Sequence, residues 1–224
     1  MRRRIEAIVF DMDGVLCDSE PFICEAAAQM FLERHKVTVR HLDFLPFVGA
    51  GENRYLGGVA ELHGVRLALD EDKRFTYNRY LQLIRGRLKP LAGAREFVAF
   101  ARKSGLKLAV ATSADLVKLE GNLREIGLPA SSFDATVNGL EVADRKPAPD
   151  LFLEACRRLG AEPGRSLVVE DAPNGIKAGK AAGCWCLGLT TSFPESVLRD
   201  AGADWIAPDL ASFPEQIALC PFAE

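Results

Sequence analysis

The sequence predicts an α/β protein, namely a doubly wound, Rossmann-like parallel sheet with an all-helical cap domain inserted after its first strand. Short apolar runs alternate with helical patterns from residue 88 onward, which is typical of parallel strands flanked by helices. Glycines follow four of these helical patterns as stop signals. Residues 18–87 contain only helical patterns. We therefore expect an α/β core of residues 1–17 and 88–224 and a cap of residues 18–87.

The expected elements follow in order along the chain. Strands are predicted at residues 6–10, 106–111, 135–137, 166–169 and 184–189, with a short edge strand at 205–206. Core helices are predicted at residues 94–104, 114–126, 150–159 and 174–182, ending at Gly105, Gly127, Gly160 and Gly183. Cap helices are predicted at residues 22–34, 52–63 and 70–85.

Composition narrows the class of protein. The 224 residues are 48% hydrophobic, so a sizeable core can form, and the net charge of −3 argues against nucleic-acid binding. No run approaches the ~20 apolar residues of a membrane span, and the first apolar run is too short for a signal peptide. The 6 cysteines include one close pair, Cys184 and Cys186, but no second pair completes a zinc set. We expect reduced cysteines in a monomeric, cytoplasmic protein.

Two carboxylates stand where the first buried strand ends, at Asp11 and Asp13. Residues at i and i+2 of a strand point the same way, and like charges held close together need a cation, a shared proton or a reaction to support them. A calcium turn is an alternative interpretation of Asp-x-Asp-Gly. However, an EF-hand loop needs more ligands and a later glutamate.

Polar residues also follow the second, third and fourth strands, at the edge of the sheet where ligands bind in doubly wound folds. Asp11, Glu170 and Asp171 are hard oxygen donors suited to Mg²⁺. Hydroxyls at a helix N-terminus suit an anion, and a lysine adds a positive charge that suits phosphate. These groups are Thr112, Ser113 and Lys146. Together they indicate phosphoryl transfer, in which an aspartate can be the nucleophile.

The motifs resemble those of the haloacid dehalogenase superfamily: Asp-x-Asp-Gly-Val, then a strand ending in Thr or Ser, then Lys-Pro, then Glu-Asp. The helical insertion resembles the small cap of its β-phosphoglucomutase-like and phosphoglycolate-phosphatase-like branch. The resemblance covers nearly the whole chain, and the motifs occur in the same order. A phospho-receiver domain is excluded because its phosphorylated aspartate follows a middle strand.

The resemblance implies a role for each motif residue. Asp11 would be the nucleophile and a Mg²⁺ ligand. Asp13 would be the general acid/base and would bind Mg²⁺ through its backbone carbonyl. The presence of this second aspartate argues for phosphate chemistry over C–halogen cleavage. Thr112 and Ser113 would hold the phosphoryl oxygens. Lys146 would pair with the phosphate and with Asp11.

The acidic pair that follows the fourth strand completes the implied metal site. Asp171 would ligate Mg²⁺, and Glu170 would bind the ion or orient its waters.

The cap departs from the patterns of this branch. Ile23 stands where many relatives have histidine, and Glu52 stands where phosphoglucomutases carry an arginine. Gln82 takes a place often held by lysine. A mutase binds a bisphosphate and needs a second cationic site, which these changes weaken. The candidate substrate-binding residues in the cap are Gly49, Glu52 and Arg54, with Arg79 and Arg85 as other cations that could serve.

The sequence thus predicts a Mg²⁺-dependent phosphatase of small phosphorylated metabolites, sugar phosphates or similar, that acts through an aspartyl-phosphate. A β-phosphoglucomutase-type isomerase is the alternative within the same fold. A weakly active sensor or interaction module is the alternative from another class. No nucleic-acid or membrane partner is expected.

Overall fold

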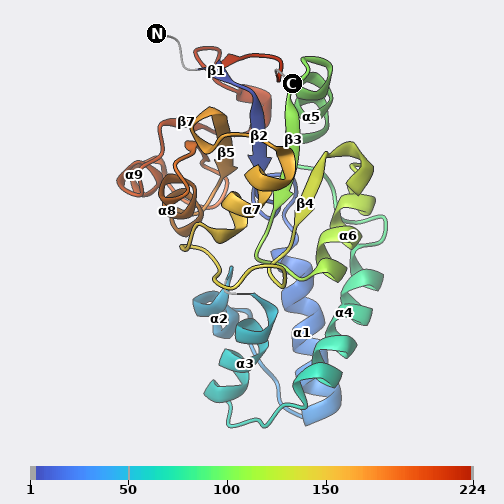
Figure 1. The fold of residues 1–224 in the computed structure, drawn as a ribbon. Coiled ribbons are helices and arrows are strands. Elements are labelled where there is room, and N and C mark those ends of the chain that lie inside the picture. Colours follow the sequence, from blue (N-terminus) through green and yellow to red (C-terminus); the bar gives the residue numbers. More distant parts are fainter. Residues whose placement is uncertain (1–3, 50, 223–224) are drawn as a thin grey trace.

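The computed structural model describes residues 4–49 and 51–222, and its core is a six-stranded parallel sheet (Figure 1). Ala50 of the cap loop lies outside the described residues. In spatial order the strands are β4 (Ala135–Val137), β3 (Lys107–Ala111), β2 (Ala7–Phe10), β5 (Ser166–Glu170), β6 (Trp185–Leu189) and β7 (Trp205–Ala207). The first strand of this sheet along the chain, β2, lies in its middle, and the later strands proceed to both edges, which confirms the predicted doubly wound fold.

Helices cover both faces of the sheet because alternate strand residues point to opposite sides. Ile8 and Phe10 of β2 belong to one buried apolar cluster with Phe97, whereas Ala7 and Val9 belong to another. The first cluster contains side chains of α5 (Ala94–Lys103) and α6 (Leu116–Glu125). The second contains side chains of α7 (Asp150–Leu159), α8 (Pro173–Ala181) and α9 (Glu195–Asp200).

The helical cap lies beyond the carboxyl ends of the strands (Figure 1). It consists of α1 (Glu20–His35), α2 (His41–Phe44), α3 (Glu52–Leu62) and α4 (Leu69–Ile84), with a 3₁₀ turn at Leu45–Phe47. Aromatic rings fill its interior, and those of Phe44 and Tyr55 stack with centroids 4.9 Å apart. These helix bounds support the proposed domain boundaries at residues 18 and 87.

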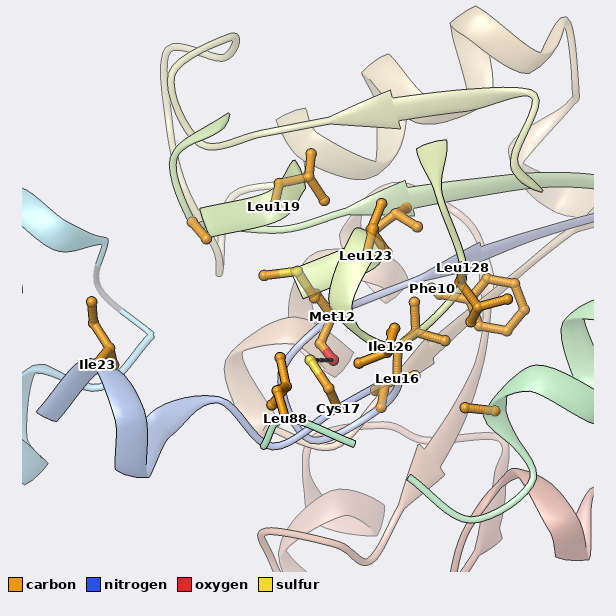
Figure 2. Close-up of a cluster of buried hydrophobic side chains, with 14 of the residues drawn as sticks. Phe10, Met12, Leu16, Cys17, Ile23, Leu88, Leu119, Leu123, Ile126 and Leu128 are labelled. Atoms are coloured by element: carbon orange, nitrogen blue, oxygen red, sulfur yellow. Dashed lines mark hydrogen bonds between the residues drawn. The ribbon is translucent and has the colours of Figure 1, made fainter. Parts of the chain in front are cut away.

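Cap and core share one continuous apolar cluster at their junction (Figure 2). Met12 and Leu16, from the loop after β2, are fully buried and belong to the same cluster as Leu119 and Leu123 of α6. Ile23 of the cap helix α1 belongs to this cluster too, at the position where relatives were expected to carry histidine. An apolar residue there is thus explained by packing.

Several short elements were not predicted, because two to six residues are too few to display a period. They are α2, α9, the paired strands β1 (Arg4–Ile5) and β8 (Ala218–Leu219), and 3₁₀ turns at Leu45–Phe47, Ala130–Ser132, Pro163–Arg165 and Leu210–Ser212. Helix α6 begins at Leu116, two residues later than predicted, because its N-cap Asp115 is extended. The six cysteines are free, as expected. Within the described ranges the helices are too short or too polar to cross a membrane.

Tyr80 of α4 is fully buried, and its hydroxyl donates a hydrogen bond across the cap–core junction to Asn122 of α6. We predict that Tyr80→Phe lowers the free energy of unfolding by about 1–2 kcal/mol, because a buried amide oxygen loses its donor. Urea denaturation measures this change. An unchanged free energy would show that Tyr80 contributes through its ring alone.

Candidate active site

The strand register brings the predicted catalytic carboxylates to one edge of the sheet. Phe10 of β2 pairs with Val110 of β3 and with Val169 of β5. The next residues, Asp11 and Glu170, are therefore level with each other, and the backbone N–H of Asp11 donates to the Val169 carbonyl at 3.0 Å. Two residues far apart in the sequence become neighbours because their strands end at the same height.

Thr112 and Ser113 lie in the turn between β3 and α6. They come before the helix rather than opening it as predicted, because α6 starts at Leu116. The Ala114 N–H donates to Thr112 Oγ1 at 3.2 Å. The buried Ser113 hydroxyl has no hydrogen-bond partner among the described residues. Ser113 is therefore a donor that a phosphoryl oxygen could accept from.

Lys146 joins the ends of two neighbouring strands. Its Nζ lies 2.5 Å from Asp11 Oδ1 and 2.6 Å from Glu170 Oε1, and its side chain is buried. Burial alone would lower the pKa of Lys146, but these two carboxylates raise it above its usual value. The ammonium group is therefore charged and could neutralise a phosphate that approaches Asp11.

Three buried carboxylates crowd around that lysine. Oxygens of Asp11, Glu170 and Asp171 all lie within 4.8 Å of one another. Burial raises the pKa of Asp11 to about 7, with Lys146 opposing this rise and Glu170 adding to it. Burial, Glu170 and Asp11 raise the pKa of Asp171 well above its usual value, and Lys146 opposes this rise. One lysine thus leaves negative charge uncompensated, and this all-oxygen set fits Mg²⁺.

A missing side chain makes room for the third carboxylate. Gly14 has φ +76°, and a Cβ at this position would lie 1.9 Å from Asp171 Oδ2. Any other residue would push Asp171 away from Asp11 and would be strained in this backbone conformation. The glycine of the first motif therefore shapes the acidic cluster itself.

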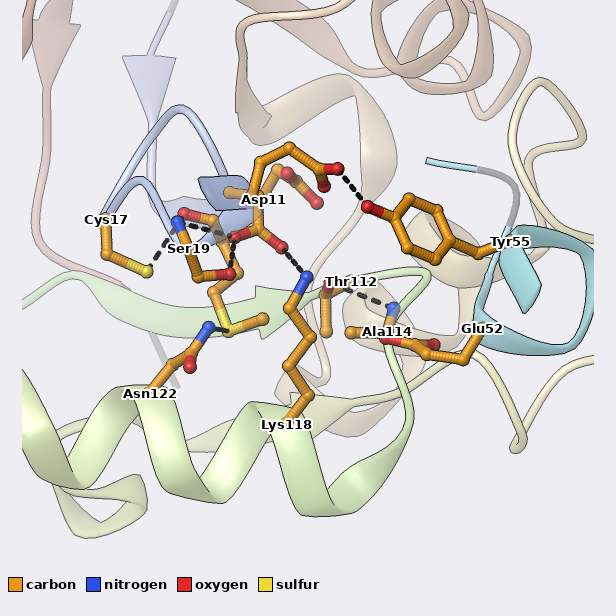
Figure 3. A network of polar contacts seen from close by, with 12 residues as sticks. Asp11, Cys17, Ser19, Glu52, Tyr55, Thr112, Ala114, Lys118 and Asn122 are labelled. Atoms are coloured by element: carbon orange, nitrogen blue, oxygen red, sulfur yellow. Dashed lines mark hydrogen bonds and ion pairs between the residues drawn. The ribbon is translucent and has the colours of Figure 1, made fainter. Parts of the chain in front are cut away.

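Asp13 has partners of its own, separate from Lys146. Its Oδ2 accepts a hydrogen bond from Lys118 Nζ at 2.8 Å, and its Oδ1 accepts from the hydroxyl and the backbone N–H of Ser19. Figure 3 shows Lys118 reaching from α6 toward the loop that carries Ser19. The two aspartates of the motif therefore stand in different electrostatic surroundings.

Sequence reasoning missed Lys118, Ser19, Glu20 and Tyr55. A signal existed for Lys118, because it precedes Leu119 on the inward face of α6 and a lysine at a core position needs a buried partner. Ser19, Glu20 and Tyr55 reach the site only through the packing of the cap, which no local pattern reports.

Lys118, Glu20 and Tyr55 line a cavity of about 460 Å³ between cap and core, together with Lys146 and the strand-end carboxylates. Of the candidate cap residues, Gly49 and Glu52 line it, as do Ile23 and Tyr55. Arg54 does not line it, because its guanidinium bonds Glu61 at 2.9 Å on the exposed side of α3. A larger, mostly apolar hollow of about 740 Å³ lies between α5 and the C-terminal segment and is lined by none of the strand-end carboxylates.

The other two cap arginines considered for substrate binding, and Gln82, also lie outside the cavity lining. Arg79 bonds Glu33 at 3.1 Å, and Arg85 and Gln82 are exposed. The cavity therefore receives its positive charge from the core, through Lys118 and Lys146, as far as the described residues show.

The fold and this site define a haloacid dehalogenase-like hydrolase. Residues 5–183 match the model of that family, and the chain belongs to it. The chain is 40% identical over 217 residues to the protein SUPPRESSOR OF QUENCHING 1, chloroplastic, of Arabidopsis thaliana, covering 93% of this chain but 20% of the plant protein. It is 32% identical over 179 residues to a phosphorylated carbohydrates phosphatase of Thermotoga maritima, covering 80% and 82% of the two chains.

Among solved structures, the chain resembles a variant of CbbY from Rhodobacter sphaeroides, crystallised with xylulose-(1,5)bisphosphate. The TM-score is 0.82 at 27% identity, covering 96% of this chain and 100% of that one. The likeness confirms the α/β core with its cap, and the phosphatase-named relative supports the prediction of a phosphatase.

Glu20 lines the cavity and accepts a hydrogen bond from Tyr55 at 2.6 Å. Burial raises its pKa from 4.5 to about 7, with Lys118 and Tyr55 opposing the rise. Folding therefore favours the protonated form, so this group's stabilisation is full below pH 4.5 and is lost as the pH rises through about 7. The free energy of unfolding of the parent protein should therefore fall between acidic and slightly alkaline pH. We predict that this fall is smaller in Glu20→Gln, by on the order of 2 kcal/mol.

Urea denaturation at about pH 5 and about pH 8 measures this effect. Glu25→Gln, which changes an exposed carboxylate on the same helix, is the matched control and should behave as the parent protein. Equal pH dependence in the parent and in Glu20→Gln would contradict the prediction.

Proposed function

We propose that the chain is a Mg²⁺-dependent phosphatase of small phosphorylated metabolites that acts through an aspartyl-phosphate on Asp11. The observation that carries the proposal is the meeting of a carboxylate, an ammonium and an unpaired hydroxyl at one sheet edge, in Asp11, Lys146 and Ser113. These are a nucleophile and two groups that neutralise or bind phosphoryl oxygens, which is what phosphoryl transfer requires.

In this mechanism Asp11 attacks the phosphorus atom while the bond to the ester oxygen breaks. Asp13 gives a proton to that leaving oxygen, which departs as an alcohol. A water molecule then attacks the phosphorus of the aspartyl-phosphate and gives a proton to Asp13. The bond between phosphorus and the Asp11 oxygen breaks, so inorganic phosphate leaves and the Asp11 carboxylate is restored. Lys146 and Ser113 hold the phosphoryl oxygens through both steps.

The metal would be held by carboxylate oxygens of Asp11, Glu170 and Asp171 and by the backbone carbonyl of Asp13. Bound Mg²⁺ supplies positive charge against the phosphoryl oxygens and against this acidic cluster. Glu170 also accepts the backbone N–H groups of Asp171 and Ala172, both at 2.9 Å. These two hydrogen bonds fix the orientation of the Glu170 carboxylate.

The cap would exclude bulk water from the aspartyl-phosphate. It contacts the core through polar groups beside the cavity: Lys73 Nζ lies 2.9 Å from Asp115 Oδ2, and Glu52 accepts the Asp115 N–H at 3.3 Å. These polar contacts would have to break for the cap to open.

The two alternatives find less support. A mutase needs a second cationic phosphate site, and the lysines that line the described cavity already face carboxylates. A sensor without turnover would not need the whole catalytic set assembled. The monomeric state and the cytoplasmic location stay predictions.

We predict that Asp11→Asn lowers kcat for phosphate release at least about 1,000-fold, because an amide cannot form the acyl phosphate. Stability should not fall, since one of three crowded carboxylates is removed. Asp70→Asn, at an exposed position outside the cavity lining, is the matched control. Phosphate release by Asp11→Asn at the parent rate would rule out this nucleophile.

We also predict that excess EDTA abolishes phosphate release and that adding Mg²⁺ raises the melting temperature of the phosphate-free protein. Saturating metal at about 100 times its Kd should add about 2.7 kcal/mol of stability. Asp171→Asn should remove most of the thermal shift. Full activity in EDTA, or an equal shift in Asp171→Asn, would contradict the metal site.

A further inference from the structure

The half of the active-site cavity that faces the cap has an unusual charge arrangement: three carboxylates surround one ammonium. Lys118 Nζ lies 2.8 Å from Asp13, and the carboxylates of Glu20 and Glu52 line the same space. Glu52 is 6% exposed, as is Lys118. Bulk solvent therefore screens Glu52 and Lys118 only weakly, so these two groups interact strongly with a molecule that enters the cavity.

The carboxyl groups of this half, on Asp13, Glu20 and Glu52, outnumber its one ammonium, on Lys118. Burial alone would lower the pKa of Lys118, yet Asp13 and the neighbouring Glu52 and Glu20 raise it well above its usual value, so the ammonium is charged. Burial raises the pKa of Glu52 while Lys118 opposes that rise. Lys118 compensates one carboxylate, and the others remain.

Glu52 is also held in place. It is the first residue of α3, where a carboxylate is favoured by the helix dipole, and its Oε2 accepts the backbone N–H of Asp115. Arg145 of the core lies against Gly51 and donates to the Gly139 carbonyl at 3.2 Å, and it is not among the residues that line the cavity. A second phosphate group would therefore meet fixed carboxylates here.

We propose that Glu52 and Lys118 determine specificity, so that the cap-facing half binds hydroxyl groups of a polyhydroxylated phosphate monoester and disfavours a second phosphate. A hydroxyl can donate to Glu52 and accept from Lys118, so both partners are satisfied by one group. A phosphate dianion has no proton to donate to Glu52, and the ionised form of Glu52 repels it. The inference rests on the proposed phosphatase function and names the substrate class.

The test compares a matched substrate pair, fructose 6-phosphate and fructose 1,6-bisphosphate, in which a phosphate replaces one hydroxyl. The parent enzyme should have the higher kcat/KM for the monophosphate. Glu52→Gln removes the charge but keeps an oxygen for the Asp115 N–H. In this variant the ratio of bisphosphate to monophosphate kcat/KM should rise at least about tenfold.

Two controls separate specificity from a structural effect. The activity of Glu52→Gln toward p-nitrophenyl phosphate, which has no hydroxyl to bind, reports folding and turnover apart from hydroxyl recognition. Glu61→Gln removes a carboxylate from the outer side of the same helix, where it bonds Arg54, and should leave the substrate ratio unchanged. A folding defect would lower all three activities together and leave the ratio as in the parent.

Each outcome decides the matter. An unchanged ratio in an active Glu52→Gln enzyme overturns the inference and leaves the phosphatase function intact. A parent enzyme that prefers phosphoethanolamine to fructose 6-phosphate overturns the hydroxyl assignment in favour of an ammonium site. A parent enzyme that releases phosphate from none of these esters overturns the proposed function and the inference with it.

Discussion

The site depends on one electrostatic constraint: three buried carboxylates share a single ammonium at the end of the sheet. Lys146 contacts both Asp11 and Glu170, and Gly14 lets Asp171 approach the same point. Removing charged groups from water is costly unless they are paired. One lysine cannot pair with all three carboxylates, so their burial is only partly compensated. The remaining negative charge favours a bound cation. In the proposed function, that cation would then help to hold a phosphate.

The cap is tied to this centre through α6. Asp115 at the start of that helix contacts Lys73 through its carboxylate and Glu52 through its backbone N–H, and one turn later Lys118 pairs with Asp13. The helix that follows the turn of Thr112 and Ser113 therefore contacts both the cap and Asp13. Movement of the cap and the surroundings of Asp13 are physically linked by this short helix.

The cavity is polarised from one end to the other. At the sheet edge, Lys146 and the unpaired hydroxyl of Ser113 suit a phosphoryl group. On the cap side, Glu20 and Glu52 outnumber the positive charge of Lys118. A small molecule with one phosphate and several hydroxyls matches both ends, which connects the proposed chemistry with the proposed substrate class.

The sequence by itself determined the doubly wound core, the inserted helices and the motif residues, because strand period, glycine stops and carboxylates at strand ends are local features. It placed the helix after Thr112 two residues early, since the extended N-cap Asp115 is not visible in a pattern. Only the tertiary structure decided which cap groups reach the cavity. Arg54 and Glu52, two residues apart, lie on opposite faces of α3 because a helix has about 3.6 residues per turn. The packing of α3 on the core then decides that the Glu52 face meets the cavity while Arg54 bonds Glu61 outside it.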